Sequence, residues 1–219
     1  MTTTLTSAPL APLLDRMFAQ ANSQTSLATG GISDEEIQRM MHSKTEYLSF
    51  YGLMKEMWLP VSRESGLLLY LLARTAKAHN VIEFGTSFGI STLHLAAALR
   101  DNGGGHLIGS EFEPSKVLKA REHLTEAGLA DLVEIREGDA LTTLASGLPD
   151  SVDLLLLDGA KPLYVDILAL LEGRLRPGAL IVADNADHSP EYLAHVRAAG
   201  SGYLSVAFGD DVEVSMRIG

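Results

Sequence analysis

From residue 79 to the end of the chain, short apolar runs alternate with stretches whose apolar residues recur at helical spacing. The apolar runs are strand candidates, at Val81–Phe84, His106–Glu111, Val133–Arg136, Val152–Asp158 and Ala179–Asp184. The helical stretches are Ile90–Arg100, Pro114–Ala127, Ala140–Ala145 and Leu163–Arg174. This alternation predicts right-handed crossovers and a parallel sheet. The run of leucines at 154–157 indicates a strand that helices cover on both faces.

The end of the chain follows a different pattern. Tyr203–Phe208 and Val212–Ile218 flank Gly209-Asp210-Asp211, which predicts a tight antiparallel hairpin. The expected fold class is therefore α/β, with a doubly wound, Rossmann-like sheet that is mostly parallel and carries an antiparallel C-terminal hairpin. In such sheets ligands bind outside the carboxyl ends of the strands, so the residues at those ends are the first candidates for a site.

The first sixty residues lack this alternation. Residues 1–30 are rich in Thr, Ser, Ala and Pro and close at Gly30-Gly31, so we interpret them as a partly flexible arm. Ser33, followed by three acidic residues, begins a helix that is expected to run towards Trp58 and to end at Pro60.

A second helix starts at Ser62 and has its body at Leu67–Ala78. We therefore expect an N-terminal arm and helical cap over residues 1–60 and a ligand-binding domain over residues 61–219. The aromatic residues of the cap, Tyr47, Tyr51 and Trp58, either line a pocket or form one packed helical face.

Composition narrows the class of protein. The net charge is -11, which disfavours nucleic acid or an anionic membrane as a partner. There is no cysteine, so disulfides, thiolate metal sites and cysteine nucleophiles are excluded. No apolar run approaches the ~20 residues of a transmembrane helix, and residues 1–18 lack the basic start of a signal peptide. The expectation is a cytoplasmic protein.

A glycine turn follows the first predicted strand, in the run Glu83-Phe84-Gly85-Thr86-Ser87-Phe88-Gly89. Gly85 and Gly89 permit a sharp turn and close approach of a ligand, or simply join strand to helix. Ser87 replaces the second glycine of the dinucleotide fingerprint, which weakens a nicotinamide-binding interpretation. An acid directly before the turn, Glu83, favours a ligand that carries an ammonium group.

Acidic residues also lie at the end of the second strand and shortly after the third. Glu111 ends the second strand and is placed to accept hydrogen bonds from ribose hydroxyls, although a solvent-facing acid is the alternative. Asp139 heads the helix after the third strand, where it caps that helix, accepts a bond from an adenine amino group, or does both.

The fourth and fifth strands end at Asp158 and at Asp184-Asn185. Adjacent strands lie ~4.8 Å apart, so these oxygen ligands can converge on a hard divalent ion, with Mg²⁺ as the first candidate. The alternative is that they only terminate a strand and make a turn. Lys161, three residues beyond Asp158, is either a base for a hydroxyl proton or a solvated charge.

With these residues assembled, the sequence resembles the metal-dependent small-molecule O-methyltransferases, the group that includes the catechol and caffeoyl-CoA enzymes, and among them the short bacterial members. The resemblance covers about residue 60 to the end. It is carried by VSRESGLLLYLLA at 61–73, VIEFGTSFGIST at 81–92, GSEFEPSK at 109–116, EGDAL at 137–141, LLLLDGAK at 154–161, RPGALIVADN at 176–185 and the terminal hairpin.

The resemblance implies a donor site for S-adenosylmethionine (SAM) in residues 61–219. Glu83, Gly85 and Ser91 would contact its methionine part, Glu111 its ribose, and Asp139 with Ala140 its adenine. Asp158 would face the donor and also join Asp184 and Asn185 as a ligand of the divalent cation. Lys161 would be the catalytic base.

Two departures concern the acceptor. Ala160 stands where catechol enzymes have a bulky aromatic residue that packs on adenine, and only residues 186–202 separate Asn185 from the next strand. In the best-known relatives a longer segment there walls the acceptor pocket.

The expected activity is methyl transfer from SAM to a hydroxyl of a small molecule, preferably one of two vicinal oxygens, by a homodimer that pairs through its N-terminal helices. The alternatives are a metal-independent O- or N-methyltransferase and a non-catalytic SAM-binding regulatory protein.

Overall fold

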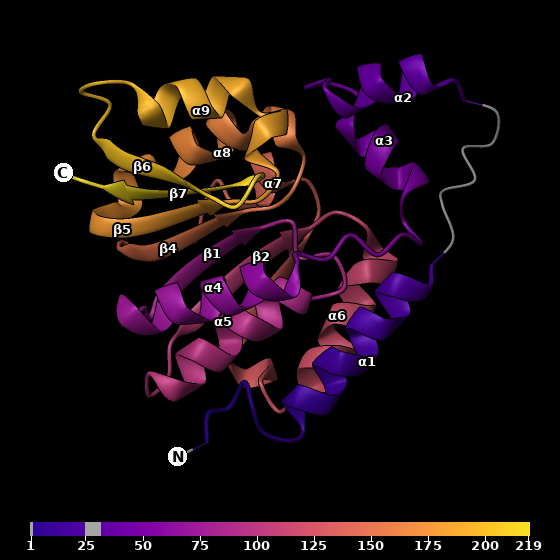
Figure 1. The fold of residues 1–219 in the computed structure, drawn as a ribbon, viewed down its shortest axis with the longest axis vertical. Helices are drawn as coiled ribbons and strands as arrows, with labels where there is room; N and C mark the ends of the chain where they lie inside the picture. The colour runs from indigo at the N-terminus through magenta and orange to yellow at the C-terminus, as the bar shows by residue number, and fades with distance from the viewer. Residues whose placement is uncertain (1, 25–31) are drawn as a thin grey trace.

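In the computed structural model, which describes residues 2–24 and 32–219, seven strands of the described residues form one mixed sheet in the order β3-β2-β1-β4-β5-β7-β6 (Figure 1). β1 to β5 run parallel, whereas β7 pairs antiparallel with both β5 and β6. The prediction of a doubly wound α/β fold with an antiparallel C-terminal hairpin is confirmed. The strands are β1 (Asn80–Phe84), β2 (His106–Glu111), β3 (Val133–Glu137), β4 (Val152–Leu157), β5 (Leu175–Ala183), β6 (Tyr203–Phe208) and β7 (Val212–Arg217).

Helices cover both faces of the sheet. One face carries α4 (Arg63–Thr75), α5 (Ile90–Asp101) and α6 (Pro114–Glu126), and the other carries α7 (Ala140–Thr143), α8 (Tyr164–Leu171) and α9 (Pro190–Arg197). Short 3₁₀ turns lie at Ala130–Leu132, Lys161–Leu163, Glu172–Arg174 and Ala186–His188. The pattern of the sequence did not indicate α9. In the described part of the chain, no helix has both the length and the apolar character that crossing a bilayer requires.

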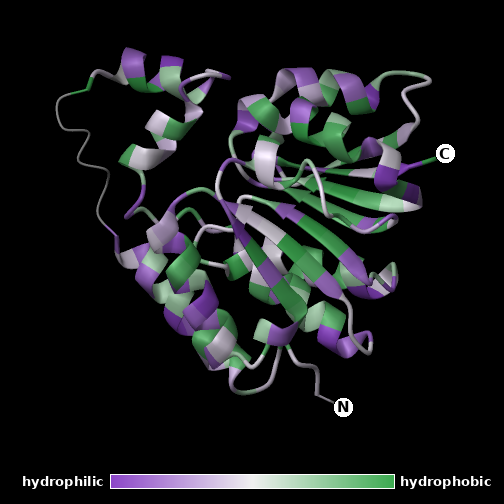
Figure 2. Cartoon of the chain, turned by 180° about the vertical axis from the view of Figure 1, so that it is seen from behind, coloured by the Kyte–Doolittle hydropathy of each residue, from purple (hydrophilic) through white to green (hydrophobic). Residues whose placement is uncertain are grey.

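The central strand β4 explains how one sequence serves two apolar cores. Leu154 and Leu156 belong to the core on one face, and Leu155 and Leu157 to the core on the other. All four side chains are fully buried, as the run of leucines predicted. Figure 2 shows hydrophobic residues concentrated in the strands at the centre of the fold.

The expectation of a partly flexible arm over residues 1–30 is wrong for its middle part, which forms α1 (Leu10–Ser23). Pro12 lies in the first turn, where a helix needs no N–H donor from that residue. One face of α1 packs on α5 and α6, beside which Figure 1 places it. Gly30-Gly31 lie outside the described residues. The buried residues of α1 recur at helical spacing: Leu10, Leu13, Leu14, Met17, Phe18 and Ala21.

The single helix expected from Ser33 to Trp58 is also wrong, because the segment forms two short helices, α2 (Asp34–Met41) and α3 (Tyr47–Leu53). Ser33 caps α2 as predicted, since its hydroxyl accepts from the amide of Glu36. The helix is interrupted where the Ser43 hydroxyl accepts from the two amides at 45 and 46, which gives the backbone a partner outside a helix.

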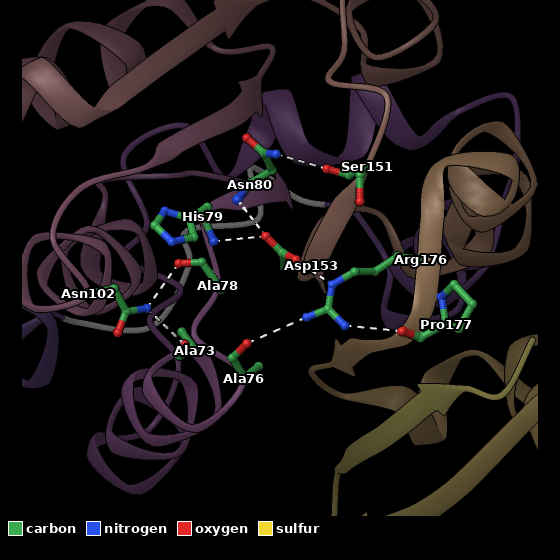
Figure 3. Close-up of polar contacts among 10 residues, drawn as sticks. All are labelled: Ala73, Ala76, Ala78, His79, Asn80, Asn102, Ser151, Asp153, Arg176 and Pro177. Carbon is green, nitrogen blue, oxygen red and sulfur yellow. Dashed lines mark hydrogen bonds and ion pairs between the residues drawn. The ribbon is translucent and has the colours of Figure 1, made fainter.

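At the amino ends of the strands, Asp153 ties three strands together (Figure 3). Its carboxylate accepts from the amides of His79 and Asn80 at 2.8 and 2.9 Å and from the Arg176 guanidinium. The Asn80 side chain also donates to the Ser151 carbonyl at 3.0 Å. Burial alone would raise the pKa of Asp153, but these hydrogen bonds outweigh it and hold the pKa below its usual value. This cluster stabilises the end of the sheet opposite the candidate site.

Replacing Asp153 with alanine should therefore lower the free energy of unfolding at pH 7 by about 2 kcal/mol, since two amides and a guanidinium lose a charged acceptor. A carboxylate with a depressed folded-state pKa stabilises above its unfolded pKa, and that stability is lost as the pH falls through the folded value. The gap between wild type and variant should shrink below about pH 4. Urea unfolding at several pH values measures it. Asp150→Ala, which removes a fully exposed carboxylate, is the control; a gap that ignores pH would contradict this role.

Candidate active site at the carboxyl ends of the strands

The turn after β1 is held against the end of β4. Gly85 has φ +98°, and a Cβ there would lie 2.6 Å from backbone atoms of Asp158 and Gly159. Ser87 follows with φ 48°, a left-handed conformation that few non-glycine residues adopt. The glycine is therefore required twice, for its conformation and for close contact between the turn and the residue that ends β4.

Glu83 lies beneath this turn and is fully buried. Its carboxylate accepts from the hydroxyls of Thr86, Ser91 and Thr92 at 3.0, 2.7 and 2.6 Å. Burial raises the pKa of Glu83 and the three hydroxyls oppose that rise. The three hydroxyl bonds tie the turn to the start of α5. The contact between Glu83 and a ligand stays a prediction.

A pocket opens beside the turn and is lined by residues of the turn, of the strand ends and of the N-terminal cap. Five of the predicted donor residues line it, namely Gly85, Glu111, Asp139, Ala140 and Asp158. Ser91 lines a smaller adjoining pocket, which also includes Gly85 and Asp158. The structure therefore brings all the predicted donor residues except Glu83 to one continuous cleft.

Glu111 and Asp139 are fixed by backbone amides. Glu111 accepts from the amides of Ser87 and Glu113 at 2.7 and 3.0 Å, and burial raises its pKa. Asp139 accepts from the amide of Leu141 and so caps α7. Burial, with a smaller contribution from hydrogen bonding to Asp139, raises the pKa of Tyr47 to about 12. Asp139 thus performs the capping role while it lines the pocket.

Sequence reasoning left open, or missed, several lining residues. The cap contributes Tyr47, Leu48, Tyr51 and Leu59, so two of the three aromatic residues line the larger pocket. The third, Trp58, lines the smaller adjoining pocket and stacks on the ring of Phe88 at 4.3 Å between centroids. Two further lining residues were not considered, Ser87 and Lys116. The Ser87 hydroxyl is buried and, among the residues described, has no hydrogen-bond partner.

Asp158 and Asp184 end the neighbouring strands β4 and β5, and the Asp184 amide donates to the Leu157 carbonyl at 2.9 Å. Burial raises the pKa of Asp184 to about 7, and the nearby charge of Asp158 adds to the rise. Burial also raises the pKa of Asp158. The charge of Asp158 reaches Asp184, and a hydrogen bond to Asp184 in turn opposes the rise at Asp158, so the two carboxyls lie close together, as the sequence predicted from adjacent strand ends.

Asn185 follows in a left-handed conformation, φ 48° and ψ 44°, and its side-chain amide donates to Asp211 at 3.3 Å. Asp184, Asn185 and Asp211 line a surface groove that also contacts α1 through Phe18 and Asn22. In the described ranges, no three His, Cys, Asp or Glu side chains are grouped so that they could hold a metal ion. The carboxylate pair would need the Asn185 oxygen, water or substrate to complete a coordination sphere.

Lys161 is buried and pairs with Asp158 at 3.1 Å, with its ammonium 5.4 Å from the centre of the Tyr164 ring. Burial alone would lower the pKa of Lys161, but the neighbouring Tyr164 and Asp158 together raise it well above its usual value. In this arrangement the lysine keeps its proton and orients Asp158. The predicted role as a base requires a change in the charge around it.

Comparison with known proteins agrees with this geometry. Residues 82–186 match a family model described as a methyltransferase domain. A catechol O-methyltransferase of Niastella koreensis is 37% identical over 130 residues, which is 58% of this chain and 58% of that protein. One of Mycobacterium tuberculosis is 36% identical over 136 residues, covering 62% of this chain and 61% of that protein. The chain therefore contains a methyltransferase domain over residues 82–186 and is similar in sequence to catechol O-methyltransferases. The match spans less than two thirds of the length of these relatives.

The fold of the chain is also that of TomG, an O-methyltransferase from Streptomyces achromogenes solved in complex with SAM. The two superpose with a TM-score of 0.64, at 22% identity, over 97% of this chain and all of that one. At this identity the likeness shows the fold alone. The resemblance predicted from the sequence motifs is confirmed.

Proposed function

We propose that this protein transfers a methyl group from SAM to a hydroxyl of a small molecule, preferably one of two vicinal oxygens, with a divalent cation at the carboxylate pair. The observation that carries the proposal is the position of Asp158. It lines the donor pocket and is also the partner of Asp184. A methyl donor and an acceptor oxygen bound on either side of this carboxylate would be adjacent, and positioning is the main contribution an enzyme makes to such a transfer.

The donor pocket suits SAM on observations independent of its relatives. Both oxygens of Glu111 are fixed by amides and keep lone pairs for ribose hydroxyls. The orphaned Ser87 hydroxyl borders both pockets and can bond the polar end of the methionine part. SAM supplies an activated methyl group when bound, so the chain has to bind and orient it and exclude water. Leu48 and Leu59 of the cap close the pocket from the outside.

The donor set suits a hard divalent cation. Asp158, Asp184 and Asn185 offer oxygen atoms, the ligands that Mg²⁺ prefers, and a cation would compensate for the burial that raises the pKa of both carboxyls. A divalent cation there acts as a Lewis acid that lowers the pKa of a bound hydroxyl. With the charge of Asp158 so used, Lys161 would lose one of the partners that raise its pKa and would release its proton to water, and the neutral amine would then be able to accept the hydroxyl proton.

A methylation assay with a catechol acceptor tests the proposal. Treatment with EDTA should lower the rate by roughly tenfold or more, and Mg²⁺ should restore it. Asp184→Asn should lose this response, whereas Asp187→Asn, which changes a half-exposed acid in the next turn, should keep it. An unchanged rate in EDTA would eliminate the role of the cation. The absence of methyl transfer to any acceptor, with SAM bound, would favour a regulatory SAM-binding protein.

Two contacts favour a metal-independent methyltransferase as the second candidate. Lys161 already neutralises Asp158, and Asn185 bonds Asp211. The same assay separates the two candidates, because only this one predicts activity in EDTA. The cytoplasmic location, the exclusion of nucleic acid and membrane, the domain boundary at residue 60 and the homodimer stay predictions.

A further inference from the structure

A buried lysine in the donor pocket has no role in the function described so far. Lys116 lies in the first turn of α6, is only 5% exposed, and lines the pocket with Glu111 and Phe112. In the part of the chain that the structure describes, its ammonium has no hydrogen bond or ion pair, and its one close partner is the ring of Phe88, 5.2 Å away. Lys119, one turn along the same helix, is exposed and pairs with Glu122 at 2.8 Å.

Lys116 is 5% exposed as a residue, but its nitrogen is not among the fully enclosed polar atoms of the described residues, so it still contacts water in the pocket. Contact with one aromatic face replaces only part of the hydration that burial of the side chain removes, which leaves the ammonium able to gain from an acceptor on a ligand. Burial accordingly lowers the pKa of Lys116, although Glu111 and Glu113 oppose that change. Lysines often pack their methylene stem and leave the head in bulk water, as Lys119 does. Lys116 differs because its surroundings are the donor pocket, so a bound ligand is the available source of an acceptor.

The position of Lys116 selects which part of a ligand it meets. It lines the larger pocket, beside the carboxylate of Glu111, but not the adjoining pocket that contains Ser91. The first pocket is the side expected for a nucleoside and the second is the side expected for the amino acid part. Because Lys116 lies beside Glu111 and away from Ser91, the ribose that Glu111 is expected to bind is the part of the ligand that it would meet first.

We propose that Lys116 is a donor-binding residue, whose ammonium donates a hydrogen bond to a ribose hydroxyl oxygen while Glu111 accepts from the ribose hydroxyls. This rests on the proposed function, in which the pocket holds SAM. The Glu111 carboxylate and the Lys116 ammonium both contact the ribose. A ribose oxygen then serves as the hydrogen-bond acceptor for the ammonium. Lys116 thereby contributes affinity for the nucleoside that is independent of the charge on the sulfur atom.

The experiment is isothermal titration of the full chain with SAM and with S-adenosylhomocysteine (SAH). For Lys116→Met, Kd should rise about tenfold or more for both ligands, because a hydrogen bond from a charged donor is lost. Lys116→Arg should recover part of the affinity. Lys119→Met, the matched control on the same helix, should bind as the wild type does.

Ribose analogues of SAH test the contact itself. The wild type should bind at least one of the 2′-deoxy and 3′-deoxy forms more weakly than SAH itself. For that analogue, Lys116→Met should bind about as well as the wild type does. A decarboxylated SAH should be weakened equally by the substitution, since the carboxylate is not the partner. If Lys116→Met does not fold, Lys116→Gln and the wild-type analogue series still decide the matter.

Each other outcome identifies what has failed. If the wild type binds neither SAM nor SAH, the proposed function fails and this inference with it. If the wild type binds and Lys116→Met binds equally well, only the inference fails. If the substitution strengthens binding of the cationic SAM and leaves neutral SAH unchanged, Lys116 acts through its charge alone and the ribose contact is refuted.

Discussion

An Asp158→Ala variant is expected to lose about 10³-fold in kcat/KM for methyl transfer while it remains folded, since groups that position charge at a reacting centre contribute on that scale. The carboxylate borders the donor pocket, holds the Lys161 ammonium at 3.1 Å and shares its environment with Asp184. Its removal therefore affects the donor side, the proposed proton acceptor and the proposed cation ligands together. Steady-state kinetics with SAM and a catechol measure the loss.

The matched control is Asp131→Ala, which removes an exposed carboxylate paired with Arg100 and should leave the rate unchanged. Titration with SAH should show that the Asp158 variant still binds the thioether product, because Glu111 and Asp139 remain in place. A variant that keeps more than about a tenth of wild-type kcat/KM would mean that the acceptor reacts elsewhere, since loss of one such group normally costs at least 10².

The positions of the site residues could be predicted from the sequence to the extent that the sheet fixes them. Asp158 and Asp184 each follow an apolar run, and parallel strands end at one edge, so their proximity follows from topology. The leucines at 154–157 were sufficient to predict that helices cover both faces of β4. Gly85 was identified because a turn between a strand and a helix restricts the residue types that fit.

What the sequence could not supply depends on contacts between distant segments. α1 has its apolar stripe in a stretch whose composition resembles a linker, and only α5 and α6 make it a stable helix. Lys116 stands in a motif at 109–116 as one charged residue among several. Its burial depends on how α6 packs beside Phe88 and Glu111.

Protonation is the second property that spacing could not determine. Glu83 and Lys161 were assigned roles from residue type and position. The protonation of each side chain, however, depends on its burial and on the groups that contact it. Three hydroxyls enclose Glu83, and the pairing of Lys161 with Asp158 and Tyr164 keeps its proton. The sequence shows which position at a strand end carries an acidic side chain. The orientation of that side chain and its pKa depend on how the surrounding residues pack.

The glycine turn allows a second test with a large expected effect. Gly85→Ala should weaken SAH binding about 100-fold and lower the free energy of unfolding by about 3 kcal/mol, from a left-handed conformation together with overpacking against the backbone. The new Cβ would lie 2.6 Å from the carbonyl of Asp158 and from the amide of Gly159, and backbone atoms cannot move aside as a flexible side chain can. The turn would have to withdraw from β4 and widen the donor pocket. Titration calorimetry and urea unfolding measure the two quantities.

A Gly128→Ala variant separates the effect of the left-handed backbone conformation from the effect of the contact between the turn and the end of β4. Gly128 has φ +68°, but a Cβ there would meet nothing within 4 Å. That variant should therefore lose about 1 kcal/mol from backbone strain alone and bind SAH normally. If both variants lose the same stability and both keep their SAH affinity, the contact between the turn and the end of β4 has no part in donor binding, and the pairing of the donor pocket with Asp158 would have to be abandoned.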